Sequence, residues 1–268
     1  LTLAMCILGP EYSSYEIAAQ DIRLAREFNL INSSHTWGRR TAGSMTRLAA
    51  DGLLGPDHNI VHGNGLSEEE LKLYMGLGCT IAATPLAEMF NSAQVALLER
   101  AERYGGVTSL GTDVDVYCSS SMLQTLRHAF LHQRETTMRE LNALGHWPPA
   151  RHAINTRRAL KWATIDGAKT LRLDHLIGSL TPGKQADLAV IRTDDMNMFA
   201  TVESGDAVHA VVMHAENHNV DSVMVAGRFL KRDRALTYPA AALTMKKQAL
   251  LDSRARLMRA GDYAYAVA

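Results

Sequence analysis

The chain has 268 residues, of which 47% are hydrophobic, and its 28 basic side chains equal its 28 acidic ones. A chain of this length and apolarity can bury a full core, as one large domain or as one domain with a smaller one attached. Zero net charge argues against the basic surface of nucleic-acid-binding and membrane-surface proteins, and no apolar run approaches the roughly 18 residues of a spanning helix. We therefore expect no nucleic-acid partner and no membrane association.

The cysteines indicate a reducing compartment. Cys6, Cys79 and Cys118 are odd in number and far apart, so we expect free thiols and a cytoplasmic protein. Residues 1–8 are apolar, but they have neither a basic lead-in nor a cleavage site, so they do not read as a signal peptide.

Strand-like and helix-like segments alternate through the first 113 residues. We expect strands at 1–8, 30–34, 58–62, 79–84 and 107–112, and helices at 13–28, 43–51, 67–75 and 91–104. Two of these helices are expected to begin with capping boxes, Ser13 with Glu16 and Ser67 with Glu70. Strands that alternate with helices in this way predict a parallel sheet with right-handed crossovers. The strands are largely apolar, as strands covered on both faces should be.

The pattern changes in the second half of the chain. Helices are expected at 121–145 and 155–171, and then a turn-rich hairpin at 177–191, short strands at 208–214, 220–225 and 228–231, and a helix at 240–259. These short strands predict a small antiparallel sheet. The predicted division is a β/α domain at 1–172, a β-sandwich segment at 173–236 and a C-terminal helix at 237–268.

Three of the five predicted parallel strands end near a residue that can bind a metal or move a proton. These residues are His35, His62 and Asp113. Parallel strands end at the same edge of a sheet, so the three side chains should converge there. Each residue alone has a plainer reading, because Asp often caps a turn after a strand and a lone His is usually a hydrogen-bonded core or loop residue.

Together with a long segment further along the chain, these residues resemble the amidohydrolase superfamily, in particular its cytosine-deaminase-like and triazine-hydrolase-like branch. The segment runs from Ala163 to Leu171 and continues from Gly178 to Leu188. The resemblance implies an α/β fold made of the C-terminal portion, about five β/α units, of a TIM-type (β/α)8 barrel, with a small antiparallel β-sandwich segment.

The resemblance also implies a chemistry. One divalent metal, zinc before iron, cobalt or manganese, would be bound by His35 and Asp113. Asp113 would also accept a proton from the metal-activated water, and His62 would polarise or orient the substrate. The implied reaction is hydrolysis of a non-peptide C–N bond, as in a deaminase or amidohydrolase, or of a carbon–halogen bond, on a small and cyclic substrate.

The sequence departs from the family pattern in three places. The His-x-His pair of the first barrel strand is absent, Gly38 stands where many relatives carry a proton-donating Glu, and the segment after Pro85 lacks the expected Ser-Asn. We expect the complete protein to carry about 190 more residues at its N-terminus, on the usual barrel size. These residues would be lost by cleavage or truncation or supplied by another chain, which predicts an oligomer or an association with the missing half.

Two other functions stay open from the sequence. One is a catalytically incomplete fragment or a non-catalytic scaffold or subunit of the same fold, in which His35 and Asp113 have no function. The other is an open doubly wound sheet that binds a nucleotide, which the absence of a glycine-rich phosphate loop after the early strands disfavours.

Overall fold

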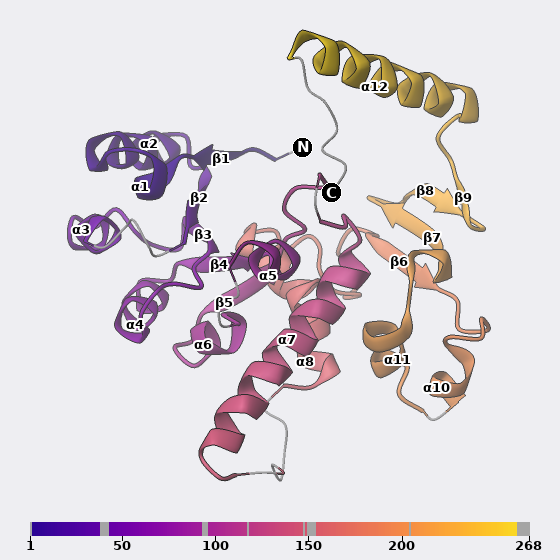
Figure 1. The fold of residues 1–268 in the computed structure, drawn as a ribbon, viewed down its shortest axis with the longest axis horizontal. Coiled ribbons are helices and arrows are strands. Elements are labelled where there is room, and N and C mark those ends of the chain that lie inside the picture. The colour runs from indigo at the N-terminus through magenta and orange to yellow at the C-terminus, as the bar shows by residue number, and fades with distance from the viewer. Residues whose placement is uncertain are drawn as a thin grey trace.

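The computed structural model describes residues 2–37, 43–92, 96–116, 118–146, 148, 154–203 and 205–261. It contains two sheets, which Figure 1 shows on different sides of helices α7 and α8. The first sheet is parallel and has five strands in chain order, β1 (Ala4–Ile7), β2 (Ile31–Thr36), β3 (His58–His62), β4 (Thr80–Ala83) and β5 (Val107–Leu110). The prediction of five parallel strands is confirmed.

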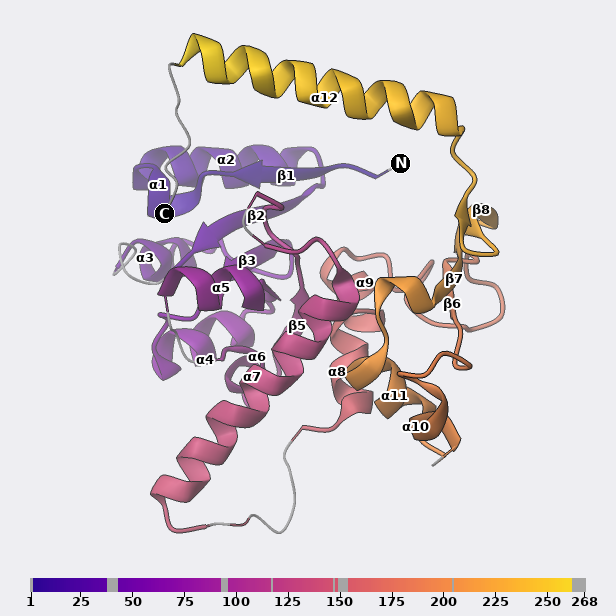
Figure 2. The same cartoon turned by 45° about the vertical axis from the view of Figure 1, so that its right-hand side comes forward.

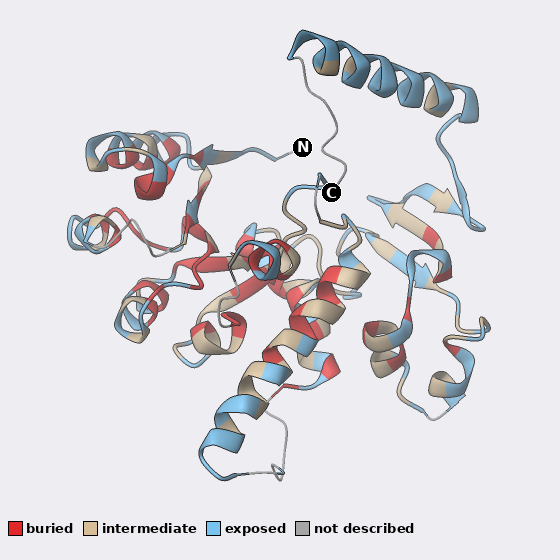
Figure 3. Cartoon of the chain, in the orientation of Figure 1, coloured by how far each residue is buried: buried red, intermediate tan, exposed pale blue. Residues whose placement is uncertain are grey.

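Helices connect these strands and cover the sheet. They are α1 (Gly9–Tyr12), α2 (Tyr15–Glu27), α3 (Ser44–Ala50), α4 (Glu68–Gly76), α5 (Pro85–Ser92) and α6 (Leu98–Glu102). Helices α2, α3, α4 and α6 lie along the outer side of the curved sheet, and most of the buried residues lie between them and the strands (Figure 3). Ile22, Leu48, Ile60 and Leu71 are fully buried members of this core. Sequential parallel strands with helices on the outside are the arrangement of a β/α barrel.

Two expectations about these helices are wrong in detail. Helix α2 is capped by Ser14, whose hydroxyl accepts from the Ile17 amide, while Ser13 donates to the carbonyl of Gly9 at 2.8 Å. The predicted capping box at Ser13 therefore does not form, because Ser13 is held by the short helix α1. The box predicted at Ser67 does form.

The helix expected at 91–104 is also wrong. Helix α5 begins earlier, at Pro85, and α6 begins later, at Leu98, while residues 93–95 lie outside the described part of the chain. Proline at the first position of a helix has its φ already set and lacks only an amide that no helical carbonyl would accept. This start signal was visible in the sequence.

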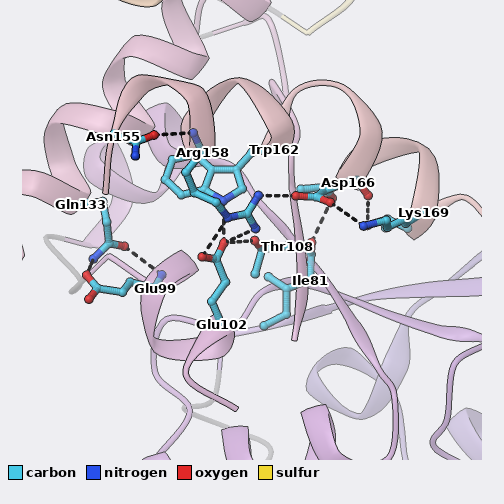
Figure 4. A network of polar contacts seen from close by, with 12 residues as sticks. Ile81, Glu99, Glu102, Thr108, Gln133, Asn155, Arg158, Trp162, Asp166 and Lys169 are labelled. Atoms are coloured by element: carbon cyan, nitrogen blue, oxygen red, sulfur yellow. Dashed lines mark hydrogen bonds and ion pairs between the residues drawn. The ribbon is translucent and has the colours of Figure 1, made fainter. Parts of the chain in front are cut away.

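Helices α8 (Thr156–Trp162) and α9 (Ile165–Thr170) pack on the last strand of the parallel sheet, and α7 (Met122–Ala143) packs on α5 and α8. The single helix expected at 155–171 is divided at Thr164, which has φ −134° and ψ −103°. Figure 4 shows Arg158 and Trp162 of α8 donating to Glu102 of α6, which also accepts from Thr108 of β5. Arg158 donates to Asp166 of α9 as well, so this network links α8 and α9 to α6 and β5.

The second sheet is antiparallel, as expected, with strand order β6 (Leu188–Ile191), β7 (Val220–Val225), β8 (Arg228–Arg232) and β9 (Ala235–Leu236). Between β6 and β7 lie α10 (Phe199–Glu203), α11 (Ala207–His214) and a 3-10 turn at Asn217–Asn219.

The strand expected at 208–214 is therefore wrong, because this segment is α11. Asp206 caps the helix by accepting from the His209 amide at 3.0 Å, and Ala210 and Val212 are buried. A short apolar run has no periodicity that separates a buried strand from a buried helix. The Asp206 cap and the packing around Ala210 and Val212 favour the helix over the strand.

The chain ends in a helix that stands apart from both sheets. Helix α12 (Ala240–Ala260) has no buried residue, and Figures 1 and 2 both show it away from the rest of the fold. Across the described ranges, no helix is long and apolar enough to cross a membrane. The domain boundaries at 172 and 236 stay a prediction.

Candidate active site

The carboxyl ends of the parallel strands bring together the three residues that the sequence singled out. His35 is the next-to-last residue of β2, His62 is the last residue of β3, and Asp113 is the third residue after the end of β5. The Nδ1 atom of His35 is 3.1 Å from Nε2 of His62, and that Nε2 is 4.0 Å from Oδ2 of Asp113. The expected convergence at this edge is therefore present.

An unusual backbone conformation at His62 produces this arrangement. In the register of the sheet, Thr36 is the partner of His62, so strand alternation alone would send His35 and His62 to opposite faces. His62 instead has φ 70°, in the left-handed region that side chains other than glycine's seldom adopt. This turn brings its ring toward His35, and the two rings stack with centroids 5.1 Å apart.

Aromatic side chains enclose the two imidazoles. Trp37 stacks on His62 with centroids 4.0 Å apart and an interplanar angle of 16°, and Tyr12 meets His35 edge-on at 5.8 Å. His62 is 1% exposed, whereas His35 is exposed. His62 is thus buried against the Trp37 ring, and His35 is the more accessible of the two imidazoles.

Asp113 also has a left-handed backbone, with φ 58°. Its Oδ2 accepts a hydrogen bond from the Thr84 hydroxyl at 3.4 Å, and the same hydroxyl lies 3.0 Å from Nδ1 of His62. Thr84 thereby links the histidine of β3 to the carboxylate after β5. Two left-handed residues in one cluster are typical of a site whose geometry the surrounding fold imposes.

The electrostatic environment favours a neutral His35. Partial burial lowers its pKa and the neighbouring His62 lowers it further, while the carboxylate of Asp113 acts in the opposite direction. A neutral imidazole has the free lone pair that a metal requires.

Sequence reasoning missed three polar residues of this cluster, namely Asn64, Thr84 and Glu88. Glu88 lies in the first turn of α5 and is 2% exposed. One of its carboxylate oxygens is 3.4 Å from Nδ1 of His62, and the other accepts from the side-chain amide of Asn64 at 3.2 Å. The signal that could have found Glu88 is its place in the segment after Pro85, where the expected Ser-Asn is missing.

The imidazole of His35 and the carboxylate of Asp113 are chemically suited to the metal that the sequence implies. Imidazole and carboxylate are ligands for zinc, iron, cobalt and manganese. In the described ranges, no group of three or more His, Cys, Asp or Glu has the geometry to hold a metal ion. The metal site predicted at His35 and Asp113 therefore stays a prediction, and Gly38 lies outside the described residues.

Curated proteins with related sequences are deaminases and hydrolases. A 5'-deoxyadenosine deaminase of Methanobrevibacter smithii is 29% identical over 187 residues, which are 69% of this chain and 40% of the relative. An S-triazine hydrolase of Gordonia rubripertincta is 28% identical over 203 residues, 73% of this chain and 39% of the relative. The chain spans about 40% of the length of these curated relatives.

Solved structures share the fold. An adenosine deaminase from Xanthomonas campestris with bound zinc superposes with a TM-score of 0.80 at 21% identity, covering 94% of this chain and 57% of that structure. An atrazine chlorohydrolase from Arthrobacter aurescens complexed with zinc gives 0.76 at 19% identity, covering 92% and 54%. The predicted fold class, a portion of a TIM-type barrel with a small antiparallel sheet, is confirmed.

The model of the amidohydrolase family matches residues 29–230, which include β2 to β5 and continue into the antiparallel sheet. This match covers the three site residues and the long segment that carried the resemblance. The chain belongs to the amidohydrolase family.

Proposed function

We propose that this chain belongs to a metal-dependent hydrolase that acts on non-peptide C–N bonds of small cyclic substrates. The chain would supply the catalytic residues at the carboxyl ends of the parallel strands. The convergence of His35, His62 and Asp113 at one edge of the parallel sheet carries the proposal. In β/α barrels this edge is the one where catalytic groups gather. The deaminases and the triazine hydrolase among the relatives support the substrate class.

The three residues have different roles in this proposal. His35, exposed and favoured in its neutral form, binds the metal together with Asp113. Asp113 accepts the proton that water loses, because a carboxylate held at a strand end by Thr84 is positioned for that transfer. His62, which stacks on Trp37 and lies 3.1 Å from Nδ1 of His35, holds the His35 ring in place and in this way orients the substrate. A bound divalent cation supplies the charge that makes water nucleophilic near neutral pH.

We further propose that the metal is zinc and that the protein works in the cytoplasm. The zinc-bound structural neighbours support the first point, and free Cys6, Cys79 and Cys118 support the second.

The sheet is proposed to associate with further β/α units, in the same polypeptide or in a partner. Among the described residues, β1 and β5 each pair with one strand only, and Cys6 of β1 is exposed. Unpaired strand edges favour association, and a barrel closes only when every strand has two neighbours.

Metal content measured together with hydrolysis tests the proposal. For the chain assembled with the further β/α units, we expect about one transition-metal ion per site by inductively coupled plasma mass spectrometry, and release of ammonia or halide from a panel of aminopurines and chlorinated triazines. His35→Ala should remove both signals. His128→Ala on α7 is the matched control, because the ring of His128 bonds to the carbonyl of Gln124 within the same helix. Equal metal content in wild type and His35→Ala would refute the proposed metal site.

A second candidate is a scaffold or subunit without catalytic activity. Gly38 in place of the proton-donating Glu favours it, as does the lack of a third metal ligand beside His35 and Asp113 in the described ranges. A chain that binds no metal and hydrolyses no member of the panel would support this second candidate.

A further inference from the structure

A buried carboxylate lies directly behind the imidazole of His62. Oε1 of Glu88 accepts from the Thr84 backbone amide at 2.7 Å and is 3.4 Å from Nδ1 of His62. Oε2 of Glu88 accepts from the Asn64 side chain at 3.2 Å. Because the side chain of Glu88 is 3% exposed and that of His62 is 1% exposed, water screens their interaction little.

Capping of helix α5 explains only part of this arrangement. A carboxylate in the first turn of a helix is favoured by the helix dipole, and the bond from the Thr84 amide satisfies a group at the helix start. That role needs neither the contact with His62 nor the contact with Asn64, both of which lie at and beyond the end of β3. A cap could also remain half exposed, as most caps do, whereas Glu88 is buried beside a ring of the candidate site.

We propose that Glu88 is a positioning residue that sets the tautomer of His62, with the hydrogen on Nδ1. Two oxygens lie near Nδ1, the Thr84 hydroxyl at 3.0 Å and the Glu88 carboxylate at 3.4 Å. An ionised carboxylate can only accept hydrogen bonds, so a lone pair on Nδ1 would face it unfavourably. Carboxylates that accept from one nitrogen of an imidazole fix the tautomer and orientation of the ring in this way.

The tautomer of His62 then decides that of His35. With its hydrogen on Nδ1, His62 presents a lone pair at Nε2, and Nδ1 of His35 at 3.1 Å must be the donor. His35 consequently keeps the lone pair on its own Nε2, where it can bind a cation. The opposite tautomer of His62 would make Nδ1 of His35 an acceptor, and the hydrogen of a neutral His35 would then block Nε2.

The relevance of these two tautomers to catalysis rests on the proposed function, but the tautomers themselves can be observed without any activity. Long-range proton–nitrogen spectra of the chain labelled with ¹⁵N-histidine distinguish ring nitrogens that carry hydrogen from those that do not. The expected result in the wild type is a protonated Nδ1 and a bare Nε2 for both His35 and His62. A wild-type spectrum with the hydrogen on Nε2 of His62 would overturn the proposal, whatever the variants do.

Variants of Glu88 show whether its charge is the cause. Glu88→Gln keeps the shape and removes the charge, so the Nδ1–H signal of His62 should weaken and that of the Nε2–H form should appear. Glu88→Asp keeps the charge and should retain more of the wild-type tautomer than Glu88→Gln. The matched control is Glu99→Gln, which neutralises a largely buried carboxylate bonded to Gln133 and Thr137 and should leave the ring signals unchanged. A folded Glu88→Gln protein with wild-type histidine signals would overturn the proposal.

Measurements of Co²⁺ binding distinguish a failure of this inference from a failure of the proposed function. If the chain binds Co²⁺, the affinity of Glu88→Gln should fall by about 10- to 100-fold, as when such supporting hydrogen bonds are lost at metal sites. If the chain binds no Co²⁺ while the wild-type spectrum shows Nδ1–H on His62, the proposed metal site fails and the role of Glu88 in setting the tautomer stands. Unchanged Co²⁺ affinity in Glu88→Gln would show that Glu88 does not prepare His35 for a metal.

Discussion

The two histidines of strand β3 lie at its two ends, and their rings contact different kinds of neighbours. His58, at the amino end, has Nδ1 bonded to Asn32 and Nε2 3.3 Å from the hydroxyl of Ser34. Complete burial lowers the pKa of His58 to about 4, against a smaller upward effect of Asp57. His62, at the carboxyl end, meets a second imidazole, an indole and two carboxylates. The His58 ring therefore stabilises the fold, whereas the His62 ring is part of the candidate active site.

Strand β5 shows the same contrast. Near its amino end, Thr108 donates to Glu102 at 2.7 Å, and this carboxylate also accepts from Arg158 and Trp162 (Figure 4). Beyond its carboxyl end lies Asp113 in a left-handed conformation. In a β/α barrel, polar groups at the amino ends stabilise the fold and those at the carboxyl ends serve the chemistry. The predictions below test this division, from the largest expected effect to the smallest.

Asp113→Asn should damage function without damaging the fold. Loss of the proposed proton acceptor should lower the hydrolysis rate by about 100-fold or more, since general bases contribute that much. Steady-state rates and a thermal melt measure the two effects side by side. Asp252→Asn on the exposed helix α12 is the control and should change neither. A fall in melting temperature large enough to account for the lost activity would show that Asp113 stabilises the fold instead.

Glu102→Ala should have the reverse effect. Removing this acceptor leaves Trp162 and Thr108 without their bonds and Arg158 without one of its two carboxylates, at a cost of about 3–4 kcal/mol in the free energy of unfolding. Urea denaturation measures the change, and the metal content of the folded fraction should stay as in the wild type. Glu135→Ala, which removes an exposed pair with Arg139, should cost under about 0.5 kcal/mol.

The buried His58 predicts a window of acid sensitivity. Because its folded pKa of about 4 lies below the usual value of 6.5, the unfolded chain takes up the proton first as the pH falls. The stability due to neutral His58 is complete above about pH 6.5, declines by about 3 kcal/mol toward pH 4, and declines no further below that. Urea midpoints across this range measure it. In His58→Gln the decline should be smaller, and an unchanged slope would assign the effect to other groups.

Ser67→Ala should have a small and purely local effect on the free energy of unfolding. The Ser67 hydroxyl accepts from the Glu70 amide at 3.2 Å, and the Glu70 carboxylate accepts from the Ser67 amide at 2.9 Å. Loss of this cap should cost about 1 kcal/mol in the same denaturation assay. Ser67→Asp retains a capping oxygen and should remain near the wild type. A larger loss in Ser67→Asp than in Ser67→Ala would mean that capping is not the contribution of Ser67.

Much of the fold could be predicted because it is encoded locally. The alternation of apolar strands with helices predicted the five strands of the parallel sheet, and the short segments at 220–225 and 228–231 predicted the strands that pair as β7 and β8. The errors fell where local signals are ambiguous. The apolar run at 208–214 suits a strand or a helix equally, and the start of α5 at Pro85 was overlooked.

The sequence by itself determined which residues reach the carboxyl edge of the sheet, because strand ends are set by local pattern and parallel strands end together. Only the tertiary structure decided how those residues face one another. Strand alternation would have separated the rings of His35 and His62, and the left-handed φ of His62 brings them together. Glu88 reaches His62 from a helix that follows another strand, and no spacing along the chain predicts a contact that depends on the position of that helix.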